Sequence, residues 1–175
     1  ENYNMVNTDK INELINCIST CDKDSYIEKI KFLSLTKKDF EGKINFSEKK
    51  YTRTCLAKNN GFELILLAWT KGQKTPIHNH DGKECFVFAL DGDFEEVCYT
   101  LDSQSQKMKK ENASILKKGE LAYTEENEKE FHSIENLSEG NALSIHLYRK
   151  PIESCLVYDE QSEEIASKNL SFDFE

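Results

Sequence analysis

Two of the four histidines in this 175-residue chain stand only two positions apart, at His78 and His80. Pro76 precedes the pair and Asp81-Gly82 follows it, which predicts a short strand that ends in a tight turn. Alternate residues of a strand point to the same face, so both imidazoles would lie on one side and could bind one metal ion. Two core or surface histidines without a ligand are the other interpretation of an isolated pair.

A second motif downstream favours the metal-binding interpretation. His132 is followed, after three intervening residues, by Asn136, and Gly72, Gly92 and Gly119 stand at the motif boundaries. This arrangement resembles the two metal-binding motifs of the cupin superfamily. The resemblance implies that the histidine pair and His132 converge on one metal ion from two strands.

Cys85 stands where a cupin usually has a glutamate, with Glu84 as the other candidate for that position. With this substitution, the stretch from Tyr51 to Cys155 resembles cysteine dioxygenase, because further residues match that family in the right order. They are Arg53, Trp69, His132, Ser144, His146 and Tyr148. The resemblance implies an Fe(II)-dependent dioxygenase that uses O2 to oxidise L-cysteine to cysteine sulfinic acid.

Arg53 is the predicted partner of the substrate carboxylate. It shares a strand face with Tyr51, and a guanidinium on the inward face of a compact barrel would be costly without a partner. The resemblance implies that Arg53, Tyr51 and Tyr148 bind the substrate, with a bidentate bond from Arg53 that orients the thiol. A solvated surface arginine is the alternative.

Ser144, His146 and Tyr148 alternate along one predicted strand, so their side chains point to one side. The residues between them are apolar, so the three could also form a solvent-facing row. The resemblance implies instead a hydrogen-bond chain in which His146 orients the Tyr148 hydroxyl and binds no metal. It also implies a thioether between Cys85 and Tyr148, where the alternative is a free buried cysteine. Two further matches are expected around the site, Trp69 and Cys155.

The metal cannot be identified from the ligand type alone, since three neutral imidazoles suit Fe, Zn, Cu or Ni. A three-histidine site leaves the 2+ charge uncompensated and favours an anionic ligand from the substrate, which a thiolate supplies. The resemblance implies Fe2+. The alternatives are a 3-mercaptopropionate dioxygenase, a Zn or Mn cupin isomerase or epimerase with Glu84 as a ligand, and a non-catalytic metal-binding cupin.

The scaffold that must position these residues is predicted to be mainly β, a cupin-type antiparallel β-barrel (jelly-roll-like) with an N-terminal α-helical cap. An apolar stripe over residues 11–18, the box Ser25-x-x-Glu28 and the box Thr36-x-x-Asp39 predict three helices. The periodicity then changes to two. Strands are expected at 51–56, 62–70, 85–90, 94–101, 112–116, 120–124, 131–137 and 142–148, with hairpin signals at Asn60-Gly61 and Asp91-Gly92.

We expect a single domain over residues 1–175, with the cap at 1–48, the barrel and metal site at 49–159, and a polar C-terminal tail at 160–175 that frays. The net charge of -9 argues against nucleic acid and anionic membranes as partners. The longest apolar run, over 64–69, is too short to cross a bilayer. Six cysteines without C-x-x-C spacing suggest free thiols in a reducing cytosol. A cytoplasmic monomer is the expectation.

Lys150 departs from the family pattern. It stands where the family has the first proline of a pair, after a cis peptide bond that lines the pocket. A cis bond before Lys150 would cost about 3 kcal/mol without a proline. The backbone conformation at this position therefore stays open.

Overall fold

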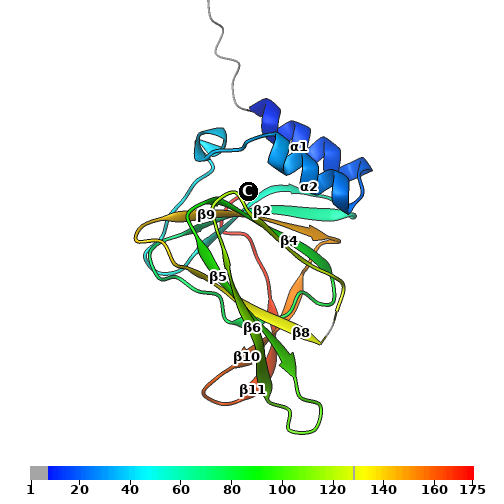
Figure 1. Cartoon of the computed structure of the whole chain (residues 1–175), viewed down its shortest axis with the longest axis vertical. Helices are drawn as coiled ribbons and strands as arrows, with labels where there is room; N and C mark the ends of the chain where they lie inside the picture. Colours follow the sequence, from blue (N-terminus) through cyan, green and yellow to red (C-terminus); the bar gives the residue numbers. More distant parts are fainter. Residues whose placement is uncertain (1–7, 128) are drawn as a thin grey trace, which may run out of the picture.

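The computed structural model describes residues 8–127 and 129–175, and these residues form mainly antiparallel β-structure (Figure 1). One sheet has the strand order β1-β2-β9-β4-β7 and the other β11-β10-β3-β8-β5-β6. The bounds are β1 Thr52–Lys58, β2 Phe62–Trp69, β3 Ile77–His78, β4 Glu84–Asp91, β5 Phe94–Leu101, β6 Met108–Leu116, β7 Leu121–Thr124, β8 Glu130–Asn136, β9 Ala142–Arg149, β10 Ser154–Asp159 and β11 Glu164–Asn169. The predicted antiparallel β-architecture is confirmed.

The N-terminal helices lie over the outer face of the five-stranded sheet (Figure 1). They are α1 (Thr8–Thr20), α2 (Lys23–Phe32) and the one-turn 3-10 helix η1 (Lys37–Phe40). The predicted stripe is confirmed, because Ile11, Leu14 and Ile18 are buried in one cluster with the outward side chains of the sheet. None of the helices in the described part of the chain is long and apolar enough to cross a bilayer.

α2 begins earlier than its predicted capping box. Asp22 is the N-cap, and its Oδ1 accepts a hydrogen bond of 2.9 Å from the backbone nitrogen of Ser25. Asp22 provides the side-chain acceptor that a helix N-terminus needs, so the helix starts at Lys23. The box at Thr36 is confirmed, with the Thr36 backbone nitrogen 2.7 Å from Asp39 Oδ2.

Alternation along β2 and β9 separates the helix-facing core from the space between the sheets. On β9, Leu143, Ile145 and Leu147 join the cluster under the helices. The intervening Ser144, His146 and Tyr148 are buried on the opposite face, between the sheets. Because the helices cover the apolar side of β9, the polar row faces the interior and not solvent.

Gly92 shows why a glycine ends the first motif. Its φ is +88°, and a Cβ built there would lie 2.5 Å from Ser138 Oγ and 2.8 Å from Ala142 Cβ. A side chain at this hairpin would therefore clash with the loop and strand that follow β8.

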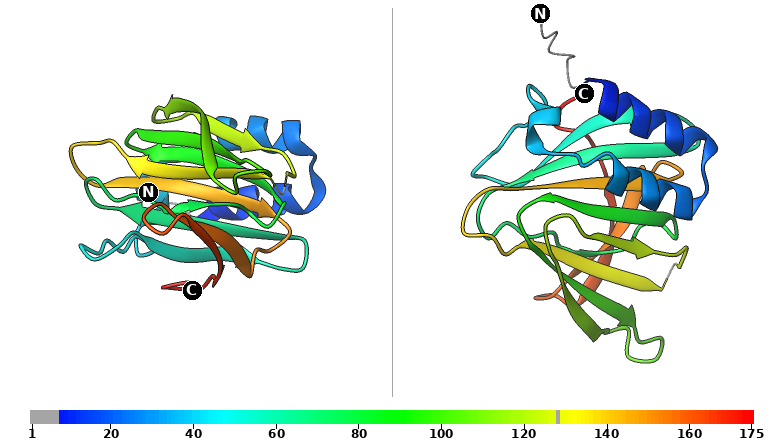
Figure 2. Two further views of the ribbon diagram at one scale, coloured as in Figure 1. Left: turned by 90° about the horizontal axis from the view of Figure 1, so that it is seen from below. Right: turned by 45° about the horizontal axis from the view of Figure 1, so that its top comes forward.

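The C-terminal residues differ from the predicted fraying tail. β11 pairs with β10 along its whole length, and the chain then returns to the first sheet, where Phe174 bridges Thr54 in parallel (Figure 2). Five of the six residues in β11 are exposed, so hydropathy gave no sign of a strand. Backbone hydrogen bonds at the sheet edge hold it in place.

The backbone conformation at Lys150, which the sequence left open, is left-handed and contains no cis bond. No cis peptide bond occurs in residues 8–127 or 129–175, and Lys150 adopts φ +90°. Its backbone nitrogen donates to the Gly61 carbonyl oxygen at 2.9 Å, which ties the end of β9 to the β1–β2 hairpin. The wall that follows Tyr148 is therefore built without the cis geometry expected for a proline pair.

Candidate metal centre

The three predicted histidines come together in one cluster between the two sheets. Each offers a ring nitrogen, and these atoms lie within 4.8 Å of one another. His78 is on β3, His80 follows that strand, and His132 is on β8. The Nε2 atoms of His78 and His132 are 3.2 Å apart, and the rings of His80 and His132 have centroids 4.2 Å apart.

Strand pairing brings the two motifs together. His78 is directly opposite His132 in the β3–β8 register, and Val157 of β10 pairs with His78 from the other side. Asn79, the residue between the two histidines, is anchored to Leu156 by two hydrogen bonds. Its Oδ1 accepts from the Leu156 backbone nitrogen at 2.8 Å, and its backbone nitrogen donates to the Leu156 carbonyl oxygen. This two-residue strand is therefore fixed on both edges.

Two acceptors determine which ring nitrogens face the cluster. His78 Nδ1 lies 2.8 Å from the Pro76 carbonyl oxygen, and His132 Nδ1 lies 3.2 Å from Glu96 Oε2. Each acceptor favours the tautomer with a proton on Nδ1, which leaves the Nε2 lone pair directed into the cluster. Sequence patterns gave no sign of Glu96, since an acid on a β-strand has no distinguishing spacing.

The electrostatic state of the cluster suits metal binding. Desolvation, reinforced by His132, lowers the pKa of His78 to about 3 and holds the pKa of His80 well below its ordinary value. Both imidazoles are therefore neutral at physiological pH, the form in which histidine binds metal. Two nitrogens that share one ion at about 2.1 Å lie no more than about 4.2 Å apart. The pair His78–His132 satisfies this limit at 3.2 Å, and the bound for all three nitrogens, 4.8 Å, exceeds it by a few tenths of an ångström. The donor set fits a transition metal ion.

The Glu84 ligand required by the isomerase alternative is not part of this cluster. Glu84 Oε1 accepts a hydrogen bond of 2.7 Å from the Tyr123 hydroxyl. Tyr123 packs against the core beneath the helices, on the other face of the sheet. A side chain held on that face cannot join the three histidines between the sheets.

A cavity of about 220 Å³ adjoins the histidines. Arg53 and seven other residues predicted for the site line this cavity, together with residues 168–171 of the C-terminal segment. These are Tyr51, His78, His80, His132, His146, Tyr148 and Cys155. Trp69, Ser144 and Cys85 are outside this lining and are buried behind it. The strands predicted to converge therefore do so around one small-molecule cavity.

The predicted hydrogen-bond chain is present in part. Trp69 Nε1 donates to Ser144 Oγ at 2.9 Å, and Ser144 Oγ lies 2.8 Å from His146 Nε2. The Trp69 indole also stacks on the Tyr51 ring at a centroid distance of 4.6 Å. His146 and Tyr148 have ring centroids 6.4 Å apart, and no hydrogen bond joins these two described residues. The chain thus runs from Trp69 to His146 and stops short of the Tyr148 hydroxyl.

Cys85 is placed where the thioether would require it. It is buried on β4 and stands directly opposite Tyr148 of β9 in the antiparallel register. Side chains opposite each other on neighbouring strands have Cβ atoms about 4.5–5.5 Å apart. Burial raises the pKa values of both Cys85 and Tyr148 well above their ordinary ranges. Both groups are therefore protonated at neutral pH.

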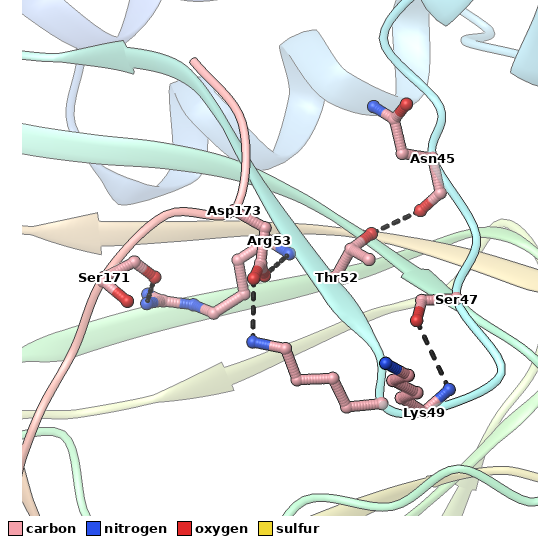
Figure 3. A network of polar contacts seen from close by, with 8 residues as sticks. Asn45, Ser47, Lys49, Thr52, Arg53, Ser171 and Asp173 are labelled. Atoms are coloured by element: carbon pink, nitrogen blue, oxygen red, sulfur yellow. Dashed lines mark hydrogen bonds and ion pairs between the residues drawn. The ribbon is translucent and has the colours of Figure 1, made fainter.

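Arg53 enters the cavity from β1 and contacts the C-terminal segment (Figure 3). Its Nη1 donates to the Ser171 carbonyl oxygen at 2.6 Å, and its Nη2 lies 3.5 Å from Glu63 Oε1. Only 12% of the side chain is exposed, so it is not the solvated surface arginine of the alternative interpretation. Sequence patterns missed both partners, because Glu63 stands in an apolar strand and Ser171 in the expected tail.

The fold and the three-histidine cluster define a cupin with a candidate metal centre. The cupin domain of Cnp3 from Schizosaccharomyces pombe shares the fold, with a TM-score of 0.50 at 13% identity over 63% of this chain and 71% of that chain. The sequence model described as "Cysteine dioxygenase type I" matches residues 27–161, and the chain belongs to that family.

Curated relatives agree with this assignment. Cysteine dioxygenase type 1 of Homo sapiens is 32% identical over 120 residues, which are 67% of this chain and 60% of the human protein. The Danio rerio protein of the same name is 31% identical over 121 residues, with the same coverage. The match thus spans about three-fifths of the length of these relatives.

Proposed function

We propose that this chain is an Fe(II)-dependent thiol dioxygenase that oxidises L-cysteine to cysteine sulfinic acid. The observation that carries the proposal is that three histidines and Arg53 line the same cavity of about 220 Å³. A metal centre and a guanidinium in one small cavity can hold the two ends of a thiol that bears a carboxylate.

His78, His80 and His132 would hold the iron. Iron(II), when bound, supplies the centre at which dioxygen and the substrate thiolate react. An all-histidine ligand set brings no negative charge to the metal, so the site favours a substrate that contributes one. The overall reaction adds both atoms of O2 to the sulfur of the thiol and converts R-SH into R-SO2H, with no further reductant.

The protein side chains bind and orient the substrate. Arg53 would donate to its carboxylate, while Tyr51 closes that end of the cavity by stacking on Trp69. Tyr148 keeps its proton because burial raises the pKa of its hydroxyl, so it can donate a hydrogen bond to the reacting groups. The bonds from Trp69 through Ser144 hold the His146 ring in one orientation behind the cavity.

An oxygen electrode tests this proposal on iron-loaded protein with three thiols, L-cysteine, 3-mercaptopropionate and cysteamine. We expect uptake of one O2 per sulfinate formed, with the highest kcat/KM for L-cysteine. His132→Ala, which loses one ligand, is the inactive control. Faster turnover of 3-mercaptopropionate would reassign the substrate. Iron-loaded protein that consumes no oxygen with any thiol would reject the dioxygenase.

A further inference from the structure

Glu63 is an acid buried in the otherwise apolar strand β2. Its side chain is 1% exposed, and within the described residues neither carboxylate oxygen has a hydrogen bond of normal geometry, although the Ile152 backbone N–H also acts to stabilise the charge. Its two contacts with cations are long: Oε1 lies 3.5 Å from Arg53 Nη2, and Oε2 lies 3.8 Å from Lys58 Nζ. A buried carboxylate with so little compensation depends strongly on the nearby guanidinium.

The Arg53 guanidinium lies between two cavities. On one side is the cavity of the metal centre, and on the other is a second cavity of about 390 Å³ that Glu63, Lys58 and Glu153 line. Ser171 and Phe172 of the C-terminal segment also contact the guanidinium, through the Ser171 carbonyl oxygen and a ring centroid 5.5 Å from Cζ. One cation is therefore available to an anion from either cavity.

The C-terminal segment keeps Arg53 at this boundary. The Arg53 backbone nitrogen donates to Asp173 Oδ2 at 2.9 Å, and the Asp173 nitrogen donates back to the Arg53 oxygen at 2.8 Å. The Cys55 nitrogen donates to the Phe174 oxygen at 2.9 Å. These bonds fix the backbone that carries Arg53. The bond from its Nη1 to the Ser171 carbonyl oxygen and the 12% exposure of its side chain restrain the guanidinium near Glu63.

We propose that Glu63 is a specificity-determining residue, whose carboxylate competes with that of the substrate for Arg53. This inference rests on the proposed role of Arg53 as the substrate-carboxylate partner. A thiol that bears a carboxylate must share the guanidinium with Glu63 and binds more weakly than it would without that acid. A thiol without a carboxylate does not use Arg53, and Glu63 leaves its binding unchanged.

Equilibrium binding tests this competition without turnover. L-cysteine and cysteamine, which differ only in the carboxylate, are titrated calorimetrically into iron(II)-loaded protein under anaerobic conditions. Glu63→Gln removes the charge and keeps the size, and we expect it to lower the Kd of L-cysteine at least about fivefold while the Kd of cysteamine stays within about twofold. Glu153→Gln neutralises an exposed acid that lines the second cavity and does not pair with Arg53. Its Kd values for both thiols should match those of the unsubstituted protein.

Two further variants separate the possible failures. Arg53→Ala should raise the Kd of L-cysteine and leave the Kd of cysteamine unchanged. If it changes neither Kd, the substrate-carboxylate role of Arg53 is wrong. If Arg53→Ala behaves as expected but Glu63→Gln leaves the Kd of L-cysteine unchanged or raises it, only the competition between Glu63 and the substrate carboxylate is overturned. Glu63→Asn, a second neutral amide, is expected to act in the same direction and replaces Glu63→Gln if that variant does not fold.

Discussion

His78 and His132 stand directly opposite each other on β3 and β8, with their Nε2 atoms 3.2 Å apart. Pro76 and Glu96 each place an acceptor beside one of the two Nδ1 atoms, and with a proton on each Nδ1 the two Nε2 lone pairs face each other across this short distance. A cation between them converts that repulsion into two bonds. The three histidines could therefore hold a metal ion without rearrangement of this pair.

Removal of a ligand should therefore remove the metal. His132→Ala is expected to leave a two-histidine site that loses most of its iron, whereas His146→Ala should retain it, because His146 bonds to Ser144 behind the cavity. Metal analysis of both purified variants after iron loading checks this. An iron-replete His132→Ala variant would contradict the three-histidine assignment.

Glu96 should strengthen metal binding without touching the metal. Loss of a carboxylate that orients a ligating histidine typically lowers metal affinity about 10–100-fold. We expect Glu96→Gln to raise the Kd for Zn2+ or Fe2+ by at least about tenfold in competition with a chelator. Glu95→Gln on the same strand, next to Glu96 but pointing to the opposite face, is the matched control. Equal affinities in the two variants would show that the Glu96–His132 contact is incidental.

The pH dependence of stability should reveal the cost of burying Glu63. Burial raises its pKa above the ordinary value of 4.5, although Arg53 and Lys58 act in the opposite direction. The folded protein therefore binds this proton more tightly than the unfolded chain, so the stabilisation is complete below pH 4.5 and is lost as pH rises through the folded pKa. Glu63→Gln cannot ionise and should raise the free energy of unfolding at pH 7.

Urea denaturation at pH 7 and at about pH 4.5 measures this effect. The advantage of Glu63→Gln over the unsubstituted protein should shrink at the lower pH. An advantage that is the same at both pH values, or larger in acid, would mean that the ionisation of Glu63 does not limit stability. Glu153→Gln again provides the control, since Glu153 is exposed.

Much of the site could be predicted from spacing, but not which side of each strand would be covered. Ser144, His146 and Tyr148 were correctly placed on one face by their alternation. Only the helices packed on Ile145 and Leu147 determine that this face is interior. Sequence patterns did locate the histidines, because metal ligation imposes fixed spacings on rare residues.

The partners of these residues were harder to predict. Glu96 meets His132 through the pairing of β5 with β8, which joins residues far apart in the sequence, and Glu63 meets Arg53 across the β1–β2 hairpin through the register of that pair. Ser171 follows β11, whose sequence is polar and has no apolar periodicity, so the sequence predicts a fraying tail there. Contacts of this kind depend on register and edge pairing, which local sequence patterns do not specify.

The opposed positions of Cys85 and Tyr148 predict a covalent link that forms during turnover. The bond joins the Cys85 sulfur to the ring carbon beside the Tyr148 hydroxyl, with loss of two hydrogens to dioxygen as the oxidant. Peptide mass spectrometry after incubation with Fe(II), L-cysteine and O2 should find a linked peptide lighter by two hydrogens. Cys85→Ser should slow turnover without abolishing it. Persistently free Cys85 after many turnovers would exclude the link.

The proposed reaction transfers both atoms of dioxygen to the sulfur of L-cysteine. The most direct measurement is mass spectrometry of the product formed by iron-loaded protein under oxygen-18 gas in unlabelled water. We expect cysteine sulfinic acid that carries two oxygen-18 atoms. Sulfinic acid with one label or none, or cystine as the sole product, would contradict it.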